Sequence, residues 1–153
     1  MDCRASLVAA LVFASVHVAN AQSTADVISQ FGLIGTWATD CGQPASDSNY
    51  LTIYAIKGSD VSRTYYDKPD HVYTNYKIVG ATPQAPDMLA YTQVWDFEGK
   101  PADIAGDRVD VLLNMTDGKF QIVSSQGSDG TFFVKDRKFP GSGDESPWQV
   151  RCR

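Results

Sequence analysis

The stretch Leu33-Ile34-Gly35-Thr36-Trp37-Ala38-Thr39-Asp40-Cys41 predicts where the folded domain begins. It combines a glycine that lets the chain enter a strand freely, a large aromatic side chain that can fill a core, and a cysteine that can form a covalent link. We expect a first strand around Gly35 to Thr39, with Trp37 pointing inward. The remaining elements can be predicted outward from this point.

The residues at the start of the chain predict a removable leader. Arg4, the apolar run from Ala5 to Val18 and the small residues Ala19-Asn20-Ala21 are typical of a secretory signal peptide. The run is shorter than the roughly 20 residues of a bilayer-spanning helix. We therefore expect residues 1–21 to be a signal peptide, residues 22–153 to form one domain, and the protein to be periplasmic or secreted.

The charge composition argues against two classes of partner. The chain has 13 Lys and Arg against 18 Asp and Glu, a formal net charge of -5. Loss of the leader removes Asp2 and Arg4 together and leaves that charge unchanged. No stripe of basic residues is present that could neutralise phosphates, so we expect neither nucleic acid nor a membrane as partner.

Two cysteines, Cys41 and Cys152, remain after the leader is removed. An even pair in an exported protein favours a disulfide. The bond would close a loop of about 110 residues and contribute on the order of 4 to 5 kcal/mol in the chain-entropy model. Two free thiols are the alternative, which a thiol titration with and without reductant would distinguish.

Downstream of Cys41 the apolar residues alternate with period two, the pattern of half-buried strands. A short helix over 23–31, which Ser23 or Thr24 can cap and Gly32 ends, precedes them. The strands expected are 35–39, 50–57, 61–66, 71–79, 87–95, 107–115, 119–125 and 131–136. Tight turns are expected at Gly58-Ser59-Asp60, Lys68-Pro69-Asp70, Asp117-Gly118 and Asp129-Gly130. A proline-containing loop is expected over 80–86, a long loop over 96–106 and an irregular tail over 139–153.

Sequential strands without a crossover helix are best satisfied by a sheet that closes on itself and removes its edges. We therefore predict an all-β fold, an eight-stranded antiparallel up-and-down barrel with a short N-terminal helix. An open sandwich is the alternative.

At this level the chain resembles the calycin superfamily, chiefly the lipocalins. The resemblance is carried by the short helix, by Gly35-x-Trp37 on the first strand, and by Thr116-Asp117 in the turn between the sixth and seventh strands, where Gly118 replaces the family's tyrosine. It implies a basic residue after the eighth strand that packs over Trp37. Arg137 is the first candidate and Arg151 the second.

The chain also resembles short exported bacterial proteins with a Gly-Thr-Trp-Ala opening. Their closing tail matches Phe139-Pro140-Gly141-Ser142-Gly143 and Pro147-Trp148 here. This second resemblance implies export and no particular activity.

Residues that carry catalysis or bind metals are sparse. His71 is the one histidine beyond the leader, and the carboxylates are scattered over turns. We therefore expect no catalytic residues, no metal ligands and no cofactor, and we interpret His71 as a surface residue. A serine, His71 and Asp70 can be combined on paper into a hydrolase triad, but a triad is recognised by geometry.

The aromatic residues are unevenly distributed. All seven tyrosines lie in the second to fifth expected strands, whereas most phenylalanines follow later. Tyrosine and tryptophan combine a large contact area with a polar group, so these strands can provide a ligand-binding wall. The candidate residues are Tyr54, Arg63, Tyr65, Tyr76, Tyr91 and Trp95. The alternative is that the tyrosines cover an exposed sheet face, and strand alternation lets all six share one face only if the registers cooperate.

Three functions follow from these observations. The leading one is an exported non-enzymatic binding protein that holds a small apolar or aromatic ligand in the barrel, which requires a cavity. The second is a protein-interaction module, such as an inhibitor of a secreted enzyme, which predicts a solid barrel, an exposed rim patch and a secreted protein partner. A hydrolase that uses His71 is the third.

Overall fold

The computed structural model describes residues 22–96 and 107–153. The expected signal peptide and residues 97–106 of the expected long loop lie outside this range. Within the described residues one helix, α1 (Thr24–Gln30), precedes nine strands. The strands are β1 (Gly35–Ala38), β2 (Leu51–Lys57), β3 (Asp60–Lys68), β4 (His71–Ala85), β5 (Met88–Trp95), β6 (Arg108–Thr116), β7 (Lys119–Gly127), β8 (Phe132–Val134) and β9 (Gln149–Arg151).

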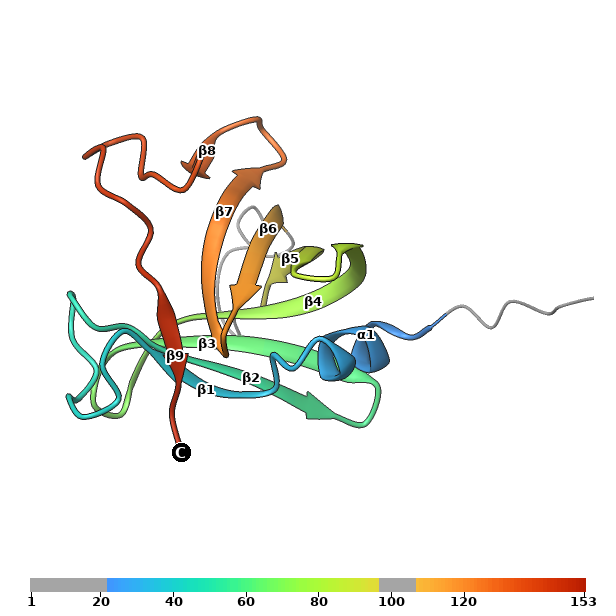
Figure 1. Cartoon of the computed structure of the whole chain (residues 1–153), viewed down its shortest axis with the longest axis horizontal. Coiled ribbons are helices and arrows are strands. Elements are labelled where there is room, and N and C mark those ends of the chain that lie inside the picture. Colours follow the sequence, from blue (N-terminus) through green and yellow to red (C-terminus); the bar gives the residue numbers. More distant parts are fainter. Residues whose placement is uncertain (1–21, 97–106) are drawn as a thin grey trace, which may run out of the picture.

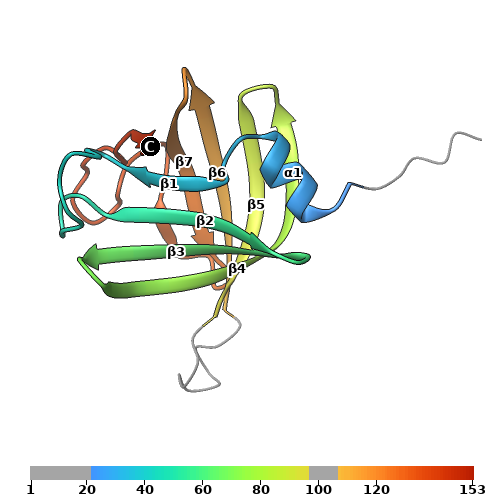
Figure 2. The same ribbon diagram turned by 90° about the horizontal axis from the view of Figure 1, so that it is seen from below.

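The strands form a closed antiparallel barrel (Figure 1 and Figure 2). Strands β1 to β7 pair in sequence order, and β9 lies between β7 and β1 and completes the ring of eight strands. Strand β8 pairs with β7 alone, outside the ring. The prediction of an eight-stranded barrel with a short N-terminal helix is confirmed, and the open sandwich is not formed.

The closing strand differs from the expected one. We predicted residues 131–136 as the last barrel strand and 139–153 as an irregular tail, but the tail supplies β9. Its pairing to β1 is fixed by a long-range tether: the Cys41–Cys152 disulfide joins residues 111 positions apart, and the Cys152 amide donates to the Thr36 carbonyl at 2.8 Å. The disulfide itself was predicted, but a strand of three residues is too short to show an alternation, so the sequence pattern did not reveal β9.

Strand β4 is longer than predicted. The residues expected as a proline-containing loop over 80–86 continue the ladder with β5 through Ala85. Register shifts between Ile78 and Gly80, and between Pro83 and Ala85, accommodate the bend and the missing proline N–H. The extended strand therefore curves from one side of the barrel to the other (Figure 1).

The helix and the tight turns form where the sequence predicted them. Ser23 caps α1 through a reciprocal pair of hydrogen bonds with Asp26, and Gly32 follows the helix with φ 82°. Asp117 and Gly118 both have positive φ, 53° and 71°, as a two-residue hairpin turn requires. These turns set the register of the strands they join.

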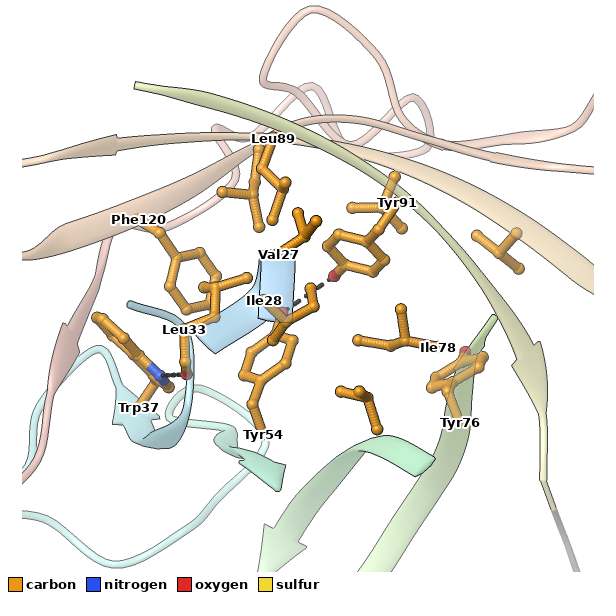
Figure 3. Packing of buried hydrophobic residues seen from close by; sticks show 14 residues of the cluster. Val27, Ile28, Leu33, Trp37, Tyr54, Tyr76, Ile78, Leu89, Tyr91 and Phe120 are labelled. Carbon is orange, nitrogen blue, oxygen red and sulfur yellow. Dashed lines mark hydrogen bonds between the residues drawn. The ribbon is translucent and has the colours of Figure 1, made fainter. Parts of the chain in front are cut away.

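Helix α1 fills one end of the barrel. It inserts Val27 and Ile28, which are 5% and 0% exposed, toward Tyr54 and Tyr91 (Figure 3). In Figure 1 the helix lies at the end of the barrel opposite β8. We call the half of the interior beneath α1 the closed half.

Trp37 points inward, as predicted, and packs in the closed half. It is 1% exposed, its ring meets Phe120 edge to face at 5.0 Å, and its Nε1 donates to the Leu33 carbonyl at 2.7 Å (Figure 3). The expectation that Arg137 packs over Trp37 is wrong. Arg137 is exposed in a turn after β8, whereas the Arg151 guanidinium lies 5.8 Å from the Trp37 ring.

The register explains this exchange of arginines. Arg151 is the β9 partner of Trp37, and β9 rather than β8 is the strand that crosses it. The Arg151 guanidinium also donates to the Ile34 carbonyl and passes over Gly35. A Cβ on Gly35 would come within 3.1 Å of Arg151 Nε, and its φ of 134° also favours glycine. Gly35, Trp37 and Arg151 therefore form one structural unit.

Candidate ligand-binding site

The strand registers place all six predicted aromatic and arginine residues on the inner face of the barrel. A single cross-strand row over β2 to β5 contains Tyr54, Arg63, Tyr76 and Trp95. Tyr65 lies two residues after Arg63, and Tyr91 lies four residues before Trp95, so period-two alternation puts both on the same face. The registers thus let all six residues share the inner face, and the four tyrosines among them do not cover an outer sheet face.

A cavity of about 460 Å³ occupies the other half of the interior, which we call the open half. Four of the six predicted residues line it: Arg63, Tyr65, Tyr76 and Trp95. Tyr54 and Tyr91 do not. Their hydroxyls hydrogen-bond each other at 3.0 Å within the closed half (Figure 3). These two tyrosines therefore belong to the packed core beneath the cavity, because α1 covers them.

Arg63 stands at the boundary between the two halves. It is 1% exposed, and its guanidinium carbon lies 4.3 Å from the Tyr65 ring centre, 5.4 Å from that of Tyr54 and 5.9 Å from that of Tyr91. Its Nη1 donates to Gln93 Oε1 at 3.2 Å. The other two nitrogens, Nε and Nη2, are buried without a hydrogen-bond partner.

The charge of Arg63 has no counter-ion within the described residues. Neither of the two ion pairs there involves it, and the residues that line the cavity include no aspartate or glutamate. Burial raises the pKa of Tyr54 and raises that of Tyr91 well above 10.0, although the positive Arg63 opposes both shifts. The tyrosines therefore stay neutral at physiological pH, and no group among the described residues compensates the positive charge of Arg63.

Two further polar atoms in the cavity wall lack a partner. They are Thr74 Oγ1 and Gln149 Oε1, in residues that are 3% and 7% exposed. Buried polar atoms in folded proteins are nearly always hydrogen-bonded, so a concentration of unpaired atoms around one cavity is unusual. Thr52 Oγ1 is a further unpaired atom, but it does not line the cavity.

The cavity reaches the surface at an aromatic rim. Tyr73, Phe133 and Phe139 contribute to its lining and are 56%, 49% and 39% exposed. Tyr50 connects the rim to the wall, since its ring lies 5.8 Å from Tyr73 and 6.5 Å from Tyr65. The residues around the mouth thus come from the β3–β4 hairpin on one side and from β8 and the tail on the other.

Sequence reasoning missed part of this site. Gln93 lies between Tyr91 and Trp95 in the same alternation, so the pattern alone could have identified it. Phe133 comes from β8, which lies within the predicted strand over 131–136, and Phe139 and Gln149 come from the tail that follows. No local signal in the sequence indicates that these residues line one cavity with Arg63.

A larger hollow of about 750 Å³ lies on the outer face of β4 to β7. It is lined by outward-facing side chains such as Ala90, Thr92 and Ser124. The Thr92 hydroxyl there is already paired with Asp110 Oδ1, at 2.5 Å. Because this hollow holds no buried charge and no unpaired buried atom, the inner cavity is the stronger candidate site.

His71 lies away from the cavity. Its Nδ1 is 2.5 Å from Asp67 Oδ1, and its side chain is 61% exposed. This hydrogen bond is the main cause that lowers the pKa of the Asp67 carboxyl. Within residues 22–96 and 107–153 no serine hydroxyl hydrogen-bonds the imidazole, and Asp70 occupies the adjacent turn. The triad drawn from the sequence is therefore not assembled there.

Among the residues that the structure describes, no group of three or more histidine, cysteine, aspartate or glutamate side chains is placed to hold a metal ion. No helix in this part of the chain has the length and apolar character needed to cross a membrane.

Comparison of the chain with models of protein families, with curated proteins and with solved structures found no match. The barrel therefore rests on the structure itself. The resemblance to the calycins stays a prediction.

Proposed function

We propose that this protein is an exported, non-enzymatic binding protein that holds a small apolar or aromatic ligand in the open half of its barrel. The cavity is the observation that carries the proposal. Its volume of about 460 Å³ falls in the range of roughly 300 to 1,000 Å³ that is usual for ligand pockets, and aromatic walls with a few polar groups are the usual lining. The leader pattern and the Cys41–Cys152 disulfide support export, because disulfides persist in oxidising compartments.

The composition of the cavity wall favours binding over catalysis. The described residues that line it include no histidine, cysteine, lysine or carboxylate. A hydrolase would need a nucleophile with an adjacent base, and the His71–Asp67 pair lies elsewhere. The protein-interaction alternative predicts a solid barrel. The cavity argues against that alternative, and the exposed aromatic rim then acts as the mouth of the ligand site.

A neutral fluorescent probe, N-phenyl-1-naphthylamine, tests this proposal. Its emission should rise saturably, with one probe bound per protein. Two adjacent serines on β7 provide a matched pair of variants, because Ser125 lines the cavity and Ser124 lines the outer hollow. Ser125→Phe should abolish the emission change by filling the cavity, and Ser124→Phe should leave it unchanged.

Two results would contradict the proposal. One is an absence of saturable binding to the wild-type protein. The other is loss of binding in Ser124→Phe with retention in Ser125→Phe, which would move the site to the outer face. Circular dichroism of both variants confirms that each is folded before the comparison is made.

A further inference from the structure

We propose that the natural ligand is an organic carboxylate. Its acid group accepts hydrogen bonds from Nε and Nη2 of Arg63, and its apolar body extends along the aromatic wall toward the rim. This inference rests on the proposed function and names the chemical class of the ligand. Its observational basis is the buried, half-paired guanidinium in the cavity wall.

The free atoms of Arg63 define the shape of the group that fits them. Gln93 occupies Nη1 and leaves Nε and Nη2, which lie along one edge of the planar guanidinium. Two parallel N–H groups on one edge match the two oxygens of a carboxylate. Tyr65 covers a face of the guanidinium at 4.3 Å, so a ligand approaches in the guanidinium plane.

The charge at the site selects an anion. Arg63 is 1% exposed and has no counter-ion among the described residues, and a buried charge of this kind is costly unless it is paired. A neutral ligand would leave the charge uncompensated, and a cation would add repulsion. A single positive charge with two free donors suits a monoanion, whereas a phosphate dianion would remain half neutralised.

The row of residues that contains Arg63 also positions the ligand body. Tyr76 and Trp95 follow Arg63 across β4 and β5, and their rings meet edge to face at 5.0 Å. Phe133 and Phe139 continue the apolar surface to the rim. A flat or chain-like apolar group attached to a carboxylate therefore has contact from the guanidinium outward.

Isothermal titration calorimetry with three probes of one shape tests the inference. The probes are 2-naphthoate, its neutral amide 2-naphthamide and the cationic 2-naphthylmethylamine. Wild-type protein should bind 2-naphthoate at least about tenfold more tightly than 2-naphthamide, because charge-assisted bidentate hydrogen bonds are about twice as strong as neutral ones. The amine should bind weakest of the three.

Two variants of Arg63 assign the preference to this residue. Arg63→Met keeps a similar length without charge, so it should bind both naphthoate and naphthamide with the affinity that the wild type has for naphthamide. Arg63→Lys keeps the charge and loses the two-pronged edge, so its preference for naphthoate should be intermediate. Should Arg63→Met fail to fold, the wild-type probe series and Arg63→Lys still decide the question.

The outcomes separate this inference from the proposed function. Equal wild-type affinity for naphthoate and naphthamide, or tightest binding of the amine, overturns the carboxylate assignment and leaves the cavity as a binding site. An unchanged preference for naphthoate in a folded Arg63→Met variant also overturns it. If none of the naphthalene probes binds, N-phenyl-1-naphthylamine included, both the inference and the proposed function fail.

Discussion

The closed and open halves of the barrel interior differ in how their buried polar atoms are satisfied. In the closed half the Trp37 indole donates to the Leu33 carbonyl, and the Tyr54 and Tyr91 hydroxyls bond each other. In the open half Arg63, Thr74 and Gln149 retain unpaired buried atoms around the cavity. One unpaired atom, Thr52 Oγ1, lies in the residue that pairs with Trp37 across β1 and β2, whereas four unpaired atoms surround the cavity. The same sheet thus encloses a half whose aromatic polar groups are paired and a half in which unpaired polar atoms are concentrated.

Under the proposed function the two halves therefore have different roles, one in stability and the other in binding. A satisfied polar pair adds stability and fixes one packing arrangement, whereas an unsatisfied buried atom lowers the stability of the empty protein. The open half therefore carries a cost that a ligand with complementary groups would remove.

The disulfide should have the largest effect, because it holds the strand that closes the barrel. Replacing both cysteines, Cys41→Ser with Cys152→Ser, releases a loop of 111 residues and should lower the free energy of unfolding by about 4 to 5 kcal/mol. Urea denaturation followed by circular dichroism measures it. A loss below about 1 kcal/mol would mean that β9 holds its place without the tether.

Trp37→Ala should lower the free energy of unfolding by about 3 to 5 kcal/mol, since it removes a buried ring that packs on Phe120. Trp95→Ala is the matched control in the open half. Trp95 is only half-buried, so its replacement should cost less stability and should weaken probe binding. A stable Trp37→Ala variant that has lost only ligand binding would contradict the division.

A paired and an unpaired hydroxyl provide the sharpest stability comparison. Tyr54→Phe leaves the Tyr91 hydroxyl buried without its partner and should cost about 1 to 3 kcal/mol. Thr74→Val removes a buried hydroxyl that has no partner in hydrogen-bond geometry, although it lies close enough to Tyr76 to oppose the rise in the pKa of that tyrosine, so the substitution should cost less stability than Tyr54→Phe. Thermal denaturation of the two variants, with Tyr54→Phe/Tyr91→Phe to complete the cycle, checks this. Equal losses of stability in Tyr54→Phe and Thr74→Val would contradict the difference between the paired and the unpaired hydroxyl.

The smallest expected effect is a loss of stability at alkaline pH. Burial raises the pKa of Tyr54, Tyr76 and Tyr91 above the ordinary value of 10.0. The stability contributed by these raised values is fully present below about pH 10 and is lost as the pH rises through the folded pKa values. Tyrosinate absorbance should therefore rise in two stages, the later one with unfolding. If all tyrosines ionise in a single stage that ends before the protein unfolds, the burial of Tyr54, Tyr76 and Tyr91 is contradicted.

The elements governed by local chemistry could be predicted from sequence. The Asp117-Gly118 turn, the Ser23 cap and the period-two alternation were sufficient for the helix, most strands and the closed barrel. The row through Tyr54, Arg63, Tyr76 and Trp95 was predicted as a set of candidates. The sequence could not show which of the candidates meet a cavity, because that depends on where α1 is packed.

The elements governed by long-range contact could not be predicted. Strand β9 has three residues, too few to show an alternation, and it follows a segment with two prolines and two glycines. The Cys41–Cys152 link was predicted, but the pairing of β9 with both β1 and β7 was not. Arg137 was wrongly expected over Trp37 for the same reason, because β9, which carries Arg151, pairs with β1. Strand β4 continues through Pro83 because shifts in register absorb the proline, which alternation cannot reveal.

Nuclear magnetic resonance of the wild-type protein during a titration with 2-naphthoate shows which half of the barrel binds the ligand. The Arg63 Nε and Gln93 side-chain amide resonances should shift most, together with the Trp95 indole, while the Trp37 indole resonance should stay in place. Shifts confined to Ala90, Thr92 and Ser124 on the outer face, or centred on Trp37, would contradict the assignment of binding to the open half.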